Sequence, residues 1–169
     1  ISIIPEFLEK IELLGLESSF EITKTQIVNK DSGSKRIFRG LRTSSGDQSA
    51  SLKSLQGVTT WVLEEAEELN DESVFDKIDL SVRSNKRQNR VIMILNPATK
   101  EHWIYKKFFE GKGVEGGSNG EIGDTTYIHT TYLDNLKNLP QSNIDALESE
   151  KYTNPDKYNH IVLGGWLSR

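Results

Sequence analysis

The chain has 169 residues, of which 35% are hydrophobic and 27% charged, and its formal net charge is -4. This length suits one compact domain with its own core, and the dispersed aromatic residues argue against a disordered chain. The chain has no cysteine and only three histidines, far apart, which excludes disulfides and argues against a structural zinc site. Tight nonspecific binding of nucleic acid needs a clustered basic surface, so the acidic balance confines any DNA contact to a local patch.

The N-terminal residues predict an amphipathic helix followed by a β-hairpin. Apolar residues recur at helical spacing over residues 4–14, Pro5 suits a first helical turn, and Gly15 is placed to end the helix. Two strand-like stretches, 20–28 and 35–41, flank a run of turn-forming residues, as expected for a hairpin. A polar loop rich in Ser and Gly comes next, followed by a short helical turn.

The middle of the chain alternates strand and helix patterns. Residues 58–63 and 90–95 are apolar on both faces, as expected for strands inside a covered parallel sheet. Between them, residues 71–82 place apolar side chains on one helical face. Asn96 and the proline after it stop the second strand, and residues 102–110 predict another helix. This alternation predicts an α/β fold with a mainly parallel sheet flanked by helices.

The C-terminal part predicts a loop, a strand and two helices. Residues 111–124 are rich in glycine and poor in apolar residues, which predicts a mobile loop or an insertion. Residues 125–132 favour a strand, residues 142–152 predict a helix beginning just after Pro140, and Asn154 opens a further short helix.

Two consecutive carboxylates, Glu64 and Glu65, follow the first apolar strand directly. Open α/β sheets bind ligands at the carboxyl ends of their strands. In P-loop ATPases the first acid at this place holds Mg²⁺, and the second polarises the water that attacks the terminal phosphate. Neighbouring strand residues point in different directions, so one carboxylate could face the metal and the other the nucleophile. The simpler alternative is that the pair only begins an acidic helical segment.

Asn96 ends the second apolar strand. Its amide could donate to a terminal phosphate or orient the attacking water, because it offers both a donor and an acceptor. The alternative is a strand-terminating Asn-Pro turn. Arg39, Arg42 and Arg83 could contact a nucleotide or serve as an arginine finger, but surface arginines are common and no role is assigned to them.

Five groups of residues occur in one order and spacing along the chain. They are Ile37-Phe38-Arg39-Gly40-Leu41; Leu52-Lys53-Ser54-Leu55-Gln56-Gly57; Trp61-Val62-Leu63-Glu64-Glu65-Ala66-Glu67-Glu68; Asn96-Pro97 with His102-Trp103-Ile104-Tyr105; and Asn154-Pro155 with Tyr158 and Leu163-Gly164-Gly165-Trp166. In these groups the chain resembles the large terminase subunit of tailed phages, in the branch typified by PBSX-like prophages. The resemblance spans nearly the whole chain.

The resemblance implies a P-loop NTPase core, RecA/ASCE-like, that couples ATP hydrolysis to movement of double-stranded DNA into a procapsid. It implies that Glu64 is the Walker B acid that holds Mg²⁺, Glu65 the catalytic carboxylate, and Asn96 part of the nucleotide-contacting motif that couples hydrolysis to DNA movement. Many ATPases have Asp at the first of these positions, so the magnesium geometry at the longer Glu64 could differ from the commoner pattern, although a Glu-Glu pair is familiar in this terminase branch. The implied cofactors are ATP and Mg²⁺. The implied partners are DNA, the terminase small subunit, the portal protein and further copies of the chain, in the cytoplasm of the bacterial host.

One element of that family is missing: no Gly-x-x-x-x-Gly-Lys-Ser/Thr sequence occurs in the chain. The chain is therefore expected to be a truncated ATPase domain without its Walker A loop. Its expected parts are a helix and hairpin region (1–57), the Walker B and coupling core (58–110), the Gly-rich loop (111–124) and a segment leading toward an absent nuclease domain (125–169). Alone it is expected to bind ATP poorly and hydrolyse it negligibly, because that loop supplies most of the phosphate contacts.

Two other functions are weighed against the motor. In the first, the chain is a non-catalytic docking module whose acids only solvate a sheet edge. In the second, it is a metal-dependent nuclease built on Glu64, Glu65 and Asp71. The nuclease ranks last, because these acids are nearly contiguous and no separate strand supplies further metal ligands.

Overall fold

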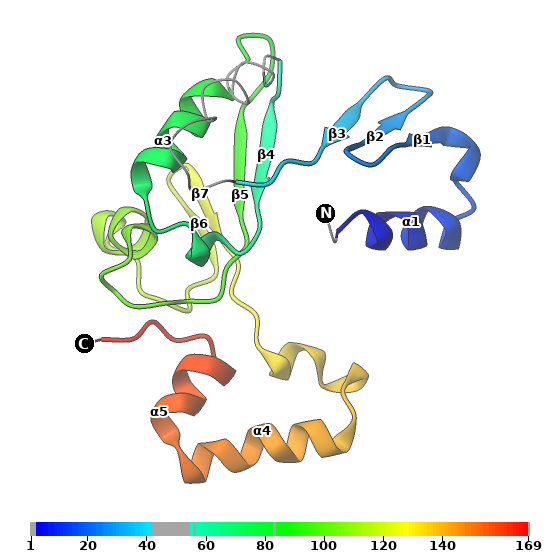
Figure 1. Ribbon diagram of the computed structural model, residues 1–169. Coiled ribbons are helices and arrows are strands. Elements are labelled where there is room, and N and C mark those ends of the chain that lie inside the picture. Colours follow the sequence, from blue (N-terminus) through cyan, green and yellow to red (C-terminus); the bar gives the residue numbers. More distant parts are fainter. Residues whose placement is uncertain (1–2, 42–54, 56, 83, 169) are drawn as a thin grey trace. The chain divides into compact units, whose positions relative to one another are not determined.

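The structure is a computed structural model that describes residues 3–41, 55, 57–82 and 84–168 (Figure 1). The chain divides into two compact units, residues 1–50 and 51–169. The polar loop predicted after the hairpin, and most of the helical turn that follows it, lie outside the described residues. No helix in the described ranges is both long and apolar enough to cross a membrane.

The first unit contains one helix and a three-stranded antiparallel sheet, which confirms the predicted helix and the predicted pairing across residues 30–34. The strand predicted over residues 20–28 is instead two strands that pair with each other, because the chain turns at Thr23, whose amide donates to the Gln26 carbonyl at 2.9 Å. The strand predicted to reach residue 41 ends at Ile37. Its elements are α1 (Ile4–Leu13), a 3₁₀ turn (Glu17–Ser19), β1 (Phe20–Ile22), β2 (Gln26–Asn29) and β3 (Lys35–Ile37), with strand order β1-β2-β3. The Phe7 ring of α1 packs edge-on against Phe38, with centroids 5.7 Å apart, and the Arg36 guanidinium lies over Phe7. These aromatic contacts join the helix to the strand end.

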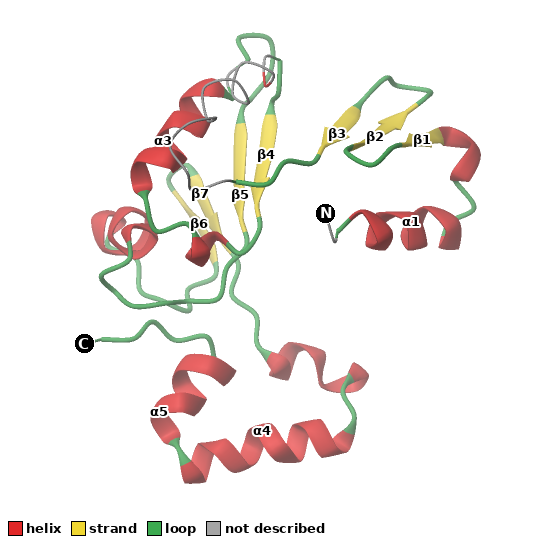
Figure 2. Cartoon of the chain, in the orientation of Figure 1, coloured by secondary structure: helices red, strands yellow, loops and turns green. Residues whose placement is uncertain are grey.

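The second unit opens with the predicted strand, helix and strand, shown in Figure 2 as two adjacent yellow arrows and a red helix. The elements are β4 (Thr60–Leu63), a 3₁₀ turn (Ala66–Glu68), α3 (Glu72–Ser81) and β5 (Arg90–Met93). β4 and β5 run parallel in a register that pairs Trp61 with Val91 and Leu63 with Met93. Both strands therefore end at the same edge of the sheet.

Only one face of this two-stranded sheet is covered in the described part of the chain. Leu63 is buried on that face, and Met93, its partner in the ladder, packs against the same core. On the opposite face Val62, Ile92 and Ile94 are 55%, 45% and 54% exposed. Within the described residues of the second unit this face is not covered as predicted, because side chains alternate along a strand and α3 packs against the other face.

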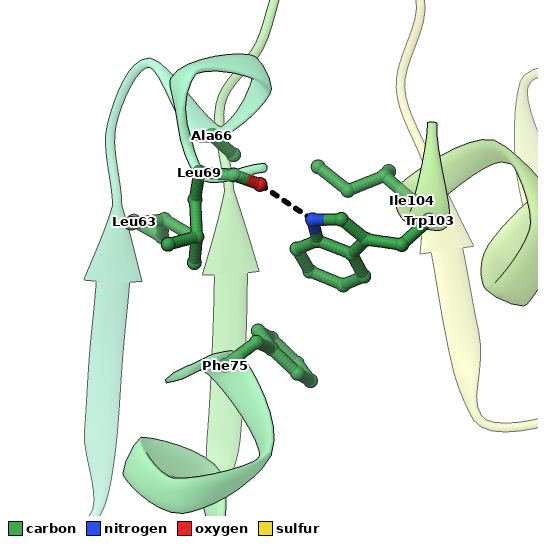
Figure 3. Close-up of a cluster of buried hydrophobic side chains, with 6 residues drawn as sticks. All are labelled: Leu63, Ala66, Leu69, Phe75, Trp103 and Ile104. Carbon is green, nitrogen blue, oxygen red and sulfur yellow. Dashed lines mark hydrogen bonds between the residues drawn. The ribbon is translucent and has the colours of Figure 1, made fainter. Parts of the chain in front are cut away.

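The core of the second unit forms around two aromatic side chains, one from α3 and one from the segment after β5. Its buried residues are Leu63, Ala66, Leu69, Phe75, Trp103 and Ile104 (Figure 3). The Phe75 and Trp103 rings lie 4.9 Å apart, and the Trp103 indole N–H donates to the carbonyl oxygen of Leu69. This hydrogen bond satisfies the one polar group of a buried tryptophan and ties the acidic turn after β4 to the later helix.

The helix predicted over residues 102–110 is present, but part of it is a π-helix (Tyr105–Phe109), followed by a 3₁₀ turn (Glu110–Lys112). The Tyr105 and Phe109 rings stack with centroids 5.8 Å apart. A Cβ atom at Gly111 would lie 2.8 Å from the Lys106 carbonyl oxygen. The backbone that follows the π-helix can therefore approach it this closely only with glycine at position 111.

The glycine-rich segment differs from its prediction as a loop. It contains β6 (Gly120–Ile122), which pairs antiparallel with β7 (Thr125–Tyr127). Gly123 has a φ of 62° in the tight turn between them, and Lys112 forms an ion pair of 2.6 Å with Asp124. Gly123 thus serves a hairpin turn, and the strand predicted to reach residue 132 already ends at Tyr127.

The C-terminal part is helical, as predicted from residue 142 onward. Its elements are a 3₁₀ segment (Tyr132–Asn138), α4 (Gln141–Thr153), α5 (Pro155–Lys157) and a π-helix (Tyr158–Val162). The Tyr132 hydroxyl donates to Glu148 on α4 and also contacts the Tyr158 hydroxyl, and its hydrogen bond with Glu148 is the main cause that raises the pKa of Tyr132. Thr99 and Leu167 form a parallel β-bridge, so the last described residues lie beside the segment that follows Asn96.

Asp71 caps the N-terminus of α3: its carboxylate accepts a hydrogen bond of 2.8 Å from the Ser73 amide, and this bonding lowers the Asp71 pKa. A carboxyl group whose pKa is lower in the folded state stabilises the fold above its unfolded pKa, and the contribution is lost as pH falls through the folded value. We expect Asp71→Ala to unfold at a lower temperature than wild type at pH 7, with the difference shrinking below pH 4. Thermal unfolding followed by circular dichroism across pH checks this. Glu68→Ala removes an exposed carboxylate that caps no helix, so it serves as the control and should unfold near the wild-type temperature at pH 7.

Candidate functional site

The carboxyl ends of β4 and β5 bring the predicted site residues to one edge of the sheet. The Ile94 amide donates to the Leu63 carbonyl at 2.9 Å, and the Ala66 amide donates to the Ile94 carbonyl at 3.0 Å. These two bonds hold the turn that carries Glu64 and Glu65 against the end of β5. Asn96 lies two residues beyond Ile94, at the same edge. The structure therefore places all three predicted residues together, although it does not test their roles.

Both carboxylates at this edge are free to take a ligand. Glu64 and Glu65 are exposed, and among the described residues neither carboxylate forms a hydrogen bond or an ion pair. Mg²⁺ prefers hard oxygen ligands and is commonly held by one or two carboxylates together with water and substrate phosphates. Two unpaired carboxylates at a strand end fit that requirement, because no existing ion pair must be broken first.

Glu65 has an unusual backbone conformation, with φ 51° and ψ 46°. It is the only non-glycine residue with positive φ in the described ranges. The left-handed region costs an ordinary residue about 1–2 kcal/mol, and such strain concentrates at functional sites. The simple alternation expected of a strand therefore does not orient Glu65. A left-handed turn that begins after β4 sets its direction instead.

This strain predicts that glycine costs less stability at position 65 than at the adjacent position 64. Glu65→Gly relieves the strained backbone, which offsets the greater freedom that glycine has in the unfolded chain. Glu64→Gly has no such strain to relieve and serves as the matched control. We expect Glu65→Gly to be more stable than Glu64→Gly by about 1 kcal/mol in urea unfolding. Equal free energies of unfolding for the two variants would contradict a strained Glu65.

Asn96 has a partner that the sequence did not reveal. Its side-chain amide donates to the carboxylate of Glu67 at 3.3 Å. The other oxygen of this carboxylate is buried and has no hydrogen-bond partner among the described groups. The acidic run after the strand is the only sequence signal that points to Glu67. The amide of Asn96 is thus held from the β4 side of the site.

His102 also contacts the acidic turn. Its Nδ1 accepts a hydrogen bond from the Ile104 amide at 3.2 Å, so in the neutral ring Nε2 carries the proton. That Nε2 lies 3.0 Å from the Glu67 carbonyl oxygen and donates to it. Together with Trp103, His102 fixes the backbone of the turn from the outside. No sequence pattern predicts this contact of His102.

The residues proposed for the nuclease alternative do not gather into one site. Asp71 is engaged as the cap of α3. Within the part of the chain that the structure describes, no group of three or more acids or histidines is arranged to hold a metal ion. Of the arginines considered as nucleotide contacts, Arg39 is exposed in the first unit, and Arg42 and Arg83 lie outside the described residues.

Residues 1–165 match the family model described as phage terminase large subunit. Two crystal forms of the large terminase from the thermophilic bacteriophage D6E share the fold. One has a TM-score of 0.59 and 14% identity, covering 95% of this chain and 37% of that chain. The other, in complex with ADP, has a TM-score of 0.59 and 17% identity, covering 97% of this chain and 36% of that chain.

These likenesses confirm the predicted α/β fold class. The chain spans little more than a third of the length of this terminase in each of the two structures. Among curated proteins, none matches the chain significantly.

Proposed function

This chain belongs to the phage terminase large subunit family, and from that premise we propose that it forms part of the ATPase motor that drives double-stranded DNA into a procapsid. The observation that carries the proposal is the pair of exposed, unpaired carboxylates, Glu64 and Glu65, at the carboxyl edge of the parallel strands β4 and β5. This is the edge where open α/β sheets bind ligands.

In this proposal each residue at the edge has a separate task. Glu64 would hold Mg²⁺, and Glu65 would orient the attacking water and act as its base. Asn96 contacts the terminal phosphate and couples its departure to DNA movement. The Glu67 carboxylate, 3.3 Å from the Asn96 amide, keeps that amide at the edge. The left-handed backbone of Glu65 sets the direction in which its side chain leaves the turn.

The cofactors of this proposal are ATP and Mg²⁺. ADP bound to one D6E large terminase supports a nucleotide site on this fold. When bound, the magnesium ion neutralises the charge that develops on the phosphates. The phosphates themselves need a Walker A loop, and these 169 residues do not contain that sequence. We therefore propose that the chain acts as the Walker B and coupling part of a longer enzyme and has negligible turnover alone.

The partners and setting of the motor are part of the same proposal. They are double-stranded DNA, the terminase small subunit, the portal protein and other copies of the chain, in the cytoplasm of the bacterial host. We propose further that the chain belongs to the PBSX-like branch and is divided into the four segments given above.

The experiment compares magnesium-dependent ATP binding and turnover in two proteins: this chain, and a longer protein that joins it to an upstream Walker A loop. Turnover confined to the longer protein supports the motor. If neither protein binds nucleotide, the non-catalytic docking module becomes the better account, in which the acids only solvate the sheet edge.

A further inference from the structure

A hollow lies at the opposite end of the parallel sheet from the carboxylates. It has a volume of about 410 Å³ and is lined by Thr59, Thr60, Arg87, Gln88 and Arg90. Thr60 begins β4 and Arg90 begins β5. Since a strand rises about 3.3 Å per residue, roughly 13 Å of sheet separates this hollow from the acidic edge. The hollow is therefore not part of the site described above.

The loop that forms one side of the hollow is held in a fixed shape. The Asn89 side chain accepts a hydrogen bond from the Ser84 amide at 2.8 Å and donates to the Ser84 carbonyl at 3.1 Å. The Ser84 hydroxyl accepts from the Lys86 amide at 3.2 Å. These hydrogen bonds fix the shape of the loop formed by residues 84–89, so the loop needs little further ordering before it can bind a ligand.

Three cationic residues lie in this loop and at the start of β5. Lys86, Arg87 and Arg90 are all exposed, and within the described ranges none of them forms an ion pair. Among the described residues, the one side-chain hydrogen bond of these three cations joins Arg90 to the Gln88 amide oxygen at 3.3 Å. The lining residues Thr59 and Thr60 add hydroxyl donors. Unpaired cations beside hydroxyl groups form a site for an anion with several acceptor oxygens.

We propose that this basic hollow binds the phosphodiester backbone of double-stranded DNA. A chain with a net charge of -4 can hold DNA only through a local cluster of this kind. The acidic and basic ends of the sheet then hold different ligands, and the rigid strands β4 and β5 connect the two. The choice of DNA over another polyanion rests on the proposed function, whereas the existence of an anion site rests on the hollow itself.

The test is fluorescence anisotropy of a short labelled DNA duplex titrated with the chain, without nucleotide, at several salt concentrations. Arg87→Glu/Arg90→Glu should weaken binding by at least about tenfold, and the slope of log affinity against log salt should fall by about 0.9 for each lost phosphate contact. The matched control is Lys137→Glu/Lys151→Glu, which makes the same change of net charge at two exposed lysines far along the chain. The control should lose less than threefold.

Equal losses in the two variants would overturn the proposal, because binding would then follow net charge alone. So would unchanged binding by Arg87→Glu/Arg90→Glu, or no binding by the wild-type chain. If that variant unfolds, Arg87→Gln/Arg90→Gln replaces it and should weaken binding at least threefold. ATP and inorganic phosphate are tested as competitors against unlabelled duplex at equal phosphate concentration. If either competes as effectively as the duplex, the hollow is a site for a small anion and not for DNA. ATP turnover is not required for this assay, so its outcome is independent of the motor proposal.

Discussion

Glu65→Gln is expected to lower ATP turnover by about 10²–10⁴-fold in the longer protein that joins this chain to a Walker A loop, because a glutamine cannot act as a base toward the attacking water. Nucleotide affinity should change little, since Glu65 lies at the edge of the sheet and the phosphates are held mainly by the loop. The amide has nearly the same shape as the carboxylate, so the left-handed turn at this position is retained. Steady-state turnover and equilibrium binding of labelled ATP separate the two effects.

Two neighbouring glutamates provide controls for this experiment. Glu68 is also exposed and lies in the same acidic run, so Glu68→Gln should leave turnover within twofold of wild type. Glu64→Gln should instead raise the Mg²⁺ concentration needed for half-maximal turnover, as expected for a lost metal ligand. Equal turnover by wild type and Glu65→Gln would show that the base is another residue.

Trp103→Ala is expected to cost about 3–5 kcal/mol of the free energy of unfolding, which is enough to unfold a domain of marginal stability. Trp103 is only 8% exposed and packs against the Phe75 ring at 4.9 Å. Its indole also satisfies the Leu69 carbonyl (Figure 3), and the truncation leaves that group buried without its donor. Urea unfolding followed by circular dichroism measures the loss.

Trp103→Phe separates the packing of the ring from its hydrogen bond. It keeps most of the apolar contact but removes the indole donor, so it should lose less than Trp103→Ala and still fall clearly below wild type. Leu80→Ala is the surface control: Leu80 is 66% exposed, and the substitution should change stability by less than about 0.5 kcal/mol. Similar losses for Trp103→Ala and Leu80→Ala would contradict the position of Trp103 in the core.

Sequence periodicity was sufficient to predict the elements that position the site. The two apolar runs became β4 and β5, and the helical face between them became α3 with Asp71 as its cap. Parallel pairing of consecutive strands then places the residues after each strand at one edge, so the meeting of Glu64, Glu65 and Asn96 followed from topology. Local pattern and chain order were enough for these features.

The contacts inside the site could not be predicted from the sequence, because they depend on register and on one backbone torsion. A strand pattern says nothing of the left-handed conformation of Glu65, which rests on the fixed turn between Leu63 and Ala66. The pairing of Asn96 with Glu67 joins residues 29 positions apart. Likewise, net charge gave no indication of the basic hollow, since a sum over the chain conceals local separation of charge.

The location of bound nucleotide tests the central claim most directly. The measurement is the change in backbone amide chemical shifts when Mg²⁺ and ADP are added to the ¹⁵N-labelled longer protein. Our account predicts that, within this chain, the largest shifts occur at the amides of Glu64, Glu65 and Asn96, at the carboxyl edge of β4 and β5. Shifts confined to Thr59, Thr60 and Arg87, at the opposite end of the strands, would contradict it.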